Sequence, residues 1–255
     1  MIPDVLLLSG CALVAFFVRG LTGAASSIVF NALLALLIPL GLSGGITLLG
    51  GLYWMALANV LASAVLVGLL ARSLRLEPVT LLLLAGLLPT TVLFSLLLPH
   101  FELGSLQLLM GIAIVGAGLY LARGEPGDGA PSRRMLLVAL PAGAGAGILS
   151  GLFGMGGPVL MLVLGPSSDD PAVFRSRFTV IAAATNVVRL VPLAWQGVYT
   201  PTQLGIFAAT VPAILLGLGA GFLAHRFVRP RLFRVGLGGL VSLADLASVA
   251  QTLVD

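Results

Sequence analysis

The stretch G-L-T-G-A-A-S-S at residues 20–27 recurs as G-L-F-G-M-G-G-P at residues 151–158, 131 residues further along the chain. Asn59 and Asn186 recur at a similar spacing, 127 residues apart. A motif and a polar residue that return in the same order at nearly the same spacing are typical of an internal repeat. We therefore interpret the chain as two homologous halves, each with one glycine-rich break.

The composition excludes a water-soluble fold. Of the 255 residues, 59% are hydrophobic and 9% are charged, whereas a soluble domain has roughly 45–50% apolar and about 25% charged residues. Polar, glycine and proline breaks divide the chain into ten apolar segments, which predicts an all-α polytopic membrane protein. The segments cover residues 4–18, 24–40, 45–70, 78–98, 104–122, 135–149, 157–165, 172–194, 202–224 and 232–253.

The sharpest polar break lies at residues 123–134 and divides the chain almost in half. We expect a first repeat over residues 1–122, a cytoplasmic linker over 123–134, and a second repeat over 135–255, all within one membrane domain. Five segments per repeat is an odd number, so the second repeat would enter the membrane inverted relative to the first. Inverted repeats are found in many secondary transporters.

The first two segments of each half are short for membrane-spanning helices. They measure about 15 to 17 residues in the first half and about 15 and 9 in the second, against about 20 needed to cross. A re-entrant hairpin and a pair of short crossing helices both fit these lengths. Each repeat is therefore expected to hold one such hairpin or pair followed by three transmembrane helices.

The arginines predict the orientation. Cytoplasmic turns collect basic residues, and the arginines other than Arg189, which lies inside a segment, fall in or beside the odd-numbered turns between segments. This places both termini on the outer, periplasmic side of a bacterial inner membrane. The basic residues form no run that could hold a nucleic acid. Cys11 is the single cysteine, and His100 and His225 fall at opposite membrane faces, so we expect no metal and no cofactor.

The doubled motif and the repeat layout resemble the TauE/SafE family of sulfite and organosulfonate exporters. The second copy, at residues 151–158, is the closer match, with Pro158 where that family commonly has glycine. The first copy has Ala24, Ala25, Ser26 and Ser27 where glycines are common. The resemblance implies transport of a small sulfur-containing anion, most often export of sulfite or an organosulfonate.

The two glycine-rich breaks are the first candidate for an anion site. Irregular backbone at membrane depth must be covered by protein or line a water-filled cavity, and a helix that starts there offers free amides and a positive dipole end to an anion. Ser26 or Ser27 is predicted to cap one such helix. Alternatively, the glycines only permit close helix packing. The residues expected to contact substrate at the breaks are Thr22, Gly23, Ser26, Ser27, Gly154, Gly156 and Gly157.

Polar side chains inside the segments extend this candidate site. Arg189 and Asn186 are three residues apart on one helix face, and an arginine beside an amide suits an oxyanion. The alternative for Arg189 is an outward, snorkelling side chain. Asn59 and Arg19 are further substrate-binding candidates, with interhelical hydrogen bonding and an ordinary cytoplasmic arginine as their alternatives. Asp245, inside the last segment, is a proton-coupling candidate or a counter-charge for an arginine.

Two other activities are compatible with a polytopic chain. An anion channel would use the same groups without alternating access. An intramembrane hydrolase would use Ser43, in G-L-S-G at residues 41–44, with His100. Because that match is short and falls in a turn, we expect no enzyme. The expected partners are membrane lipid and a small anionic substrate, with a second copy of the chain left open.

Overall fold

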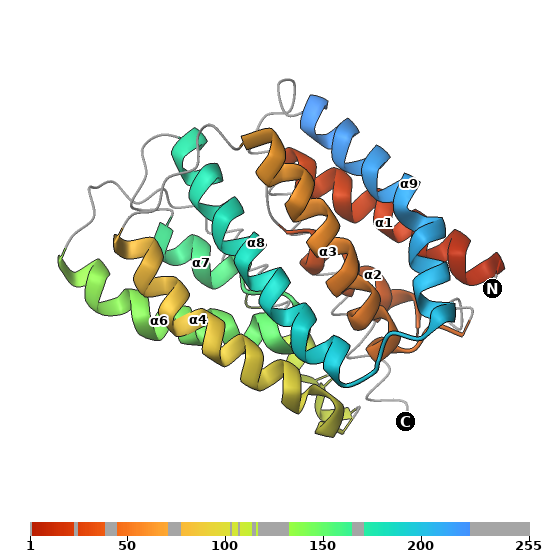
Figure 1. The fold of residues 1–255 in the computed structure, drawn as a ribbon, viewed down its shortest axis with the longest axis horizontal. Helices are drawn as coiled ribbons and strands as arrows, with labels where there is room; N and C mark the ends of the chain where they lie inside the picture. The colour runs from red at the N-terminus through yellow and green to blue at the C-terminus, as the bar shows by residue number, and fades with distance from the viewer. Residues whose placement is uncertain are drawn as a thin grey trace. The chain divides into compact units, whose positions relative to one another are not determined.

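The computed structural model describes residues 2–22, 25–38, 45–70, 78–102, 104–106, 108–113, 116, 133–164 and 171–224. Every regular element named within these ranges is a helix (Figure 1). They are α1 (Ile2–Thr22), α2 (Ser26–Leu37), α3 (Leu48–Leu70), α4 (Pro78–Leu97), the 3-10 helix η2 (Leu98–His100), α6 (Arg133–Phe153), α7 (Gly157–Leu164), α8 (Pro171–Trp195) and α9 (Pro201–Ala224).

Six of these helices are long and apolar enough to cross a membrane, namely α1, α3, α4, α6, α8 and α9. The chain is therefore a multi-pass membrane protein, as its composition predicts.

The prediction of two short segments at the start of each half is wrong for the first member of each pair. Both α1 and α6 have 21 residues, because the helix continues through the first glycine of each motif instead of stopping before it. The second members are short, with 12 residues in α2 and 8 in α7, or about 18 and 12 Å at 1.5 Å per residue. A short α2 and α7 are what a re-entrant arrangement requires, and that arrangement remains a prediction.

The helices group into two compact units, and the first contains α1, α2, α3 as far as Ala58, and α9. Here α1 and α9 lie side by side with their backbones in direct contact. A Cβ added to Gly20 would lie 2.7 Å from the Phe222 backbone nitrogen, and one added to Gly217 would lie 2.6 Å from the Leu13 carbonyl oxygen. Small residues allow helices in a membrane to approach this closely.

The second unit contains α3 from Asn59 onward, α4, η2, α6, α7 and α8. Its closest contact joins α6 to α4 through a glycine at every fourth residue of α6, at positions 143, 147 and 151. A Cβ added to Gly151 would lie 2.8 Å from the Thr91 carbonyl oxygen. The Thr91 and Ser95 hydroxyls donate hydrogen bonds of 3.4 Å to the carbonyls of Gly147 and Gly151.

Membership of the two units crosses the boundary between the predicted repeats. In unit 1, α1 of the first repeat packs on α9 of the second, whereas in unit 2, α6 of the second repeat packs on α4 of the first. By order within each repeat, α1 corresponds to α6 and α4 to α9. The α1–α9 contact and the α6–α4 contact therefore join corresponding helices, and each takes one helix from each predicted repeat. This correspondence agrees with duplication. The inverted orientation of the repeats remains a prediction.

Candidate functional site

The break after α6 is built by its glycines. Gly154 has φ of 70°, the left-handed conformation that glycine adopts readily after a helix end, and its N–H donates a 2.9 Å hydrogen bond to the Ser150 carbonyl. Gly156 follows against α6, where an added Cβ would meet Ser150 and lie 2.8 Å from the Ala146 carbonyl oxygen. At Gly157, where α7 begins, an added Cβ would lie 3.3 Å from Phe178. Close packing against α6 therefore explains the glycine at position 156. The left-handed turn that ends α6 explains the glycine at position 154.

Arg189 closes the same break from α8. Its side chain is 1% exposed, so the outward, snorkelling alternative is wrong. Its Nε donates to the Gly151 carbonyl oxygen and its Nη2 to the Leu152 carbonyl oxygen, each at 3.3 Å. The last carbonyls of a helix lack N–H donors within the helix and carry the negative end of its dipole. Arg189 therefore stabilises the C-terminus of α6.

Asn186 lies on α8 and joins it to α3. Its Nδ2 donates to Ser63 Oγ at 2.8 Å and to the Asn59 carbonyl oxygen at 3.4 Å. The two asparagines that the repeat pairs with each other thus meet directly, and both are buried. The contact uses the backbone carbonyl of Asn59, so the role of the Asn59 side chain, in substrate binding or in an interhelical hydrogen bond, stays a prediction.

The break between α1 and α2 differs from the break after α6 in the helix end that its arginine meets. Arg19, in the last turn of α1, is 4% exposed, and its Nη1 donates to Ser26 Oγ at 3.4 Å. Ser26 is the first residue of α2, so the guanidinium lies at the N-terminus of that helix, where the dipole is also positive. Thr22 Oγ1 turns back to its own helix and donates to the Val18 carbonyl at 2.9 Å.

The predicted serine cap of α2 is wrong. The N-cap is Ala25, with φ of 71° and ψ of 0°, and no side chain caps the helix. Ser26 and Ser27 are instead its first two helical residues, and both are buried. The cap geometry follows from the left-handed turn at Ala25, which moves the helix start one residue earlier than the serine pattern predicts. Gly23 lies outside the described residues.

The structure thus assembles the predicted residues into two groups, one in each unit. Arg19 and Ser26 form the first, and Arg189, Asn186 and Asn59 with the glycine break after α6 form the second. The sequence reasoning missed Ser63, although its position four residues after Asn59 places both on one face of α3. Arg177, one of the arginines counted above beside the odd-numbered turns, is 7% exposed on α8. Asp245 and Ser43 lie outside the described residues.

Comparison with known families decides the class of protein. The model of the family described as Sulfite exporter TauE/SafE matches residues 8–247. The chain belongs to the TauE/SafE family. No curated protein and no solved structure matches the chain significantly. TauE/SafE is a family of membrane transporters, and the six apolar helices of this chain agree with that class.

Proposed function

We propose that this TauE/SafE protein is a secondary transporter that exports sulfite or a small organosulfonate across a bacterial inner membrane. Membership of the family supports an exported sulfur oxyanion. A buried positive site supports an anionic substrate in particular, because an anion transferred into a membrane protein needs preformed donors to replace its water.

The observation that carries the proposal is the position of Arg19. Its guanidinium is buried and lies 3.4 Å from Ser26 Oγ, at the first residue of α2. A buried arginine and a helix N-terminus both attract negative charge, and planar guanidinium can hold two oxyanion oxygens at once. The binding group proposed here is therefore Arg19 with Ser26, Ser27 and the first turn of α2.

Arg189 and Asn186 have a supporting role in this proposal. The Arg189 guanidinium is directed to two carbonyl oxygens of α6, and the Asn186 amide to Ser63 and Asn59. The Arg189 contacts stabilise the break between α6 and α7, and the Asn186 contacts join α8 to α3. A substrate that reaches Arg189 would compete with those carbonyls, so we place the stronger anion contact at Arg19. Asp245 remains the candidate for proton coupling.

The test is uptake of labelled sulfite into proteoliposomes, with and without an imposed pH gradient. Arg19→Gln should abolish saturable uptake, and Arg19→Lys should retain part of it because the charge stays while the paired donors are lost. Arg133→Gln, at the first residue of α6, is the matched control that removes one positive charge elsewhere. Full uptake in Arg19→Gln would sink the proposed binding group, and no uptake by the wild type would exclude sulfite.

The same vesicles separate a transporter from a channel. A transporter gives flux that saturates with substrate and responds to the driving gradient. A channel gives an uncoupled conductance in planar bilayers that persists when the pH gradient is collapsed. Conductance of that kind with sulfite as the charge carrier would replace the transporter proposal by the channel alternative.

A further inference from the structure

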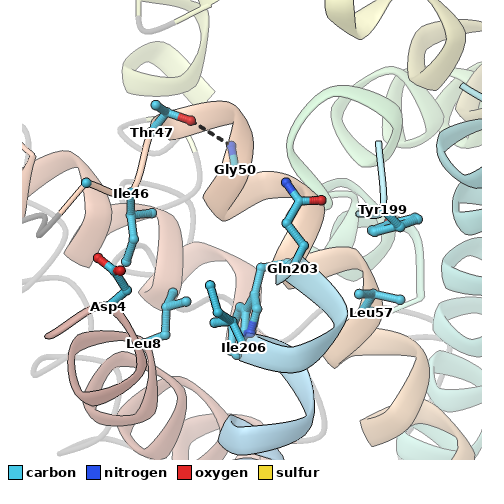
Figure 2. Close-up of a pocket in the computed structure, with 11 residues that line it drawn as sticks. Asp4, Leu8, Ile46, Thr47, Gly50, Leu57, Tyr199, Gln203 and Ile206 are labelled. Atoms are coloured by element: carbon cyan, nitrogen blue, oxygen red, sulfur yellow. Dashed lines mark hydrogen bonds between the residues drawn. The ribbon is translucent and has the colours of Figure 1, made fainter. Parts of the chain in front are cut away.

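A cavity of about 200 Å³ lies within unit 1, where the first turns of α1, α3 and α9 meet (Figure 2). Asp4 of α1, Trp54 of α3 and Gln203 of α9 line it, together with Tyr199 just before α9. None of the residues assigned above to anion binding belongs to this lining. In the predicted topology these helix starts lie on the outer side of the membrane.

The charge carried by the described lining of this cavity has the opposite sign from that of an anion site. Among the eleven described residues that line it, Asp4 is the one with a charged side chain. The helix starts around it already have protein acceptors, since the Gly50 N–H donates to Thr47 Oγ1 at 3.1 Å and the Gln203 N–H to Thr200 Oγ1 at 3.3 Å. The Asp4 carboxylate therefore gives the described lining a negative charge, and an apolar lining strengthens the field of that charge relative to water.

Two aromatic rings are held in place around the same cavity. Trp54 stacks on Phe30 with ring centroids 4.9 Å apart, and its Nε1 donates to Thr210 Oγ1 at 3.1 Å. The Tyr199 hydroxyl donates to the Tyr53 carbonyl at 3.3 Å. The polar atoms of both rings are thus engaged with protein, and Phe30 covers one face of Trp54, so the cavity is lined by the remaining ring surface of Trp54 and by Tyr199. The face of an aromatic ring attracts a cation, most strongly in a site with little water.

Figure 2 shows Asp4 on one side of this cavity and Tyr199 on the other, with Gln203 between them. We propose that the cavity binds a small organic ammonium ion, with Asp4 as the opposite charge and Trp54 and Tyr199 as aromatic walls. A primary or methylated amine of a few heavy atoms suits a space of about 200 Å³. An inorganic cation would use the carboxylate and leave the aromatic walls unused.

Trp54 also supplies the reporter for the test. The chain has two tryptophans, and Trp195 is 85% exposed, so Trp195→Phe leaves Trp54 as the only one. Tetramethylammonium chloride added to the full-length protein in detergent should change its fluorescence saturably, whereas sodium chloride at equal ionic strength should not. Asp4→Asn should weaken binding by roughly tenfold or more. Glu102→Gln, which removes an exposed carboxylate, should leave binding unchanged.

A second variant keeps the test decisive if Asp4→Asn does not fold. Gln203 occupies the third position after Thr200, where glutamate forms a good capping box, so Gln203→Glu should fold and should tighten binding several-fold by adding a carboxylate. Unchanged or weaker binding in that variant would overturn the proposal. So would equal binding of tert-butanol, which is neutral and of similar size, because the cavity would then select shape and not charge.

Discussion

The side-chain amide of Asn186 donates a 3.4 Å hydrogen bond to the backbone carbonyl of Asn59, and these are the two residues that the predicted internal repeat pairs with each other. The same amide reaches Ser63 Oγ at 2.8 Å. The contact ties α3 of the first repeat to α8 of the second within unit 2. A polar link between buried helix faces limits their rotation, because turning either helix would leave an amide or a hydroxyl unsatisfied in an apolar environment.

The Asn186–Ser63 hydrogen bond should contribute measurably to stability. Interhelical hydrogen bonds in membrane proteins are worth about 0.6 kcal/mol on average and up to about 1.7 kcal/mol. We expect a coupling energy in this range from a double-mutant cycle of Asn186→Ala and Ser63→Ala, measured by unfolding in mixed detergent–SDS micelles. Strict additivity of the two substitutions would show that the bond contributes nothing to the folded state.

Arg189 should act on stability more than on substrate affinity. Arg189→Met removes the guanidinium donors from the Gly151 and Leu152 carbonyls. Gly151 keeps the Ser95 hydroxyl as a donor, and a buried acceptor that is left unsatisfied costs about 1–3 kcal/mol. We expect unfolding at a lower SDS fraction, with partial recovery in Arg189→Lys. Transport by the folded fraction should keep its substrate half-saturation. A much higher half-saturation with unchanged stability would instead place Arg189 in the substrate path.

Ser26 should affect transport through Arg19. Its hydroxyl accepts the Arg19 hydrogen bond at the start of α2, so Ser26→Ala should raise the sulfite half-saturation several-fold by loosening the guanidinium, with about 1 kcal/mol lost. Thr22→Val is the matched control, because the Thr22 hydroxyl donates to a carbonyl of its own helix. Equal effects of the two substitutions on half-saturation would argue against a special role of Ser26.

The α4–α6 contact should tolerate no added side chain at its glycines. A Cβ on Gly147 would lie 2.5 Å from the Leu87 carbonyl oxygen, whereas at Gly145 nothing lies within 4 Å. Gly147→Ala should therefore destabilise the fold by about 1–3 kcal/mol, as overpacking does. Gly145→Ala, two residues away on the same helix, should be neutral or slightly stabilising. Thermal unfolding in detergent distinguishes the two, and similar midpoints would contradict the packing shown here.

Gly154 should be replaceable by asparagine but not by alanine. Its φ of 70° disfavours most residues by about 1–2 kcal/mol, while asparagine tolerates this region better. Gly154→Ala should lower the unfolding midpoint, and Gly154→Asn should recover part of the loss. If both variants unfold like the wild type, the left-handed turn after α6 is not required for the fold.

The sequence by itself determined the membrane class and the approximate positions of the helices. Its 59% hydrophobic composition leaves no alternative to spanning helices, because burial of so much apolar surface needs lipid as well as a core. The short α2 and α7 after the glycine motifs were also predictable from the distance between breaks. These properties depend on composition and spacing along the chain, which a sequence displays directly.

Only the tertiary structure decided what the glycines and arginines contact. The sequence pattern indicates helix ends at Gly20 and Gly151, yet both lie inside helices. Glycine is needed at these positions because each faces a neighbouring backbone that leaves no room for a side chain. Arg189 and Arg19 are both buried arginines beside a glycine-rich break, yet one meets the C-terminus of α6 and the other the N-terminus of α2. A helix N-terminus is positive and a C-terminus negative in every helix, but which of these ends a buried arginine meets is decided by the packing of the helices, which the local sequence pattern does not display.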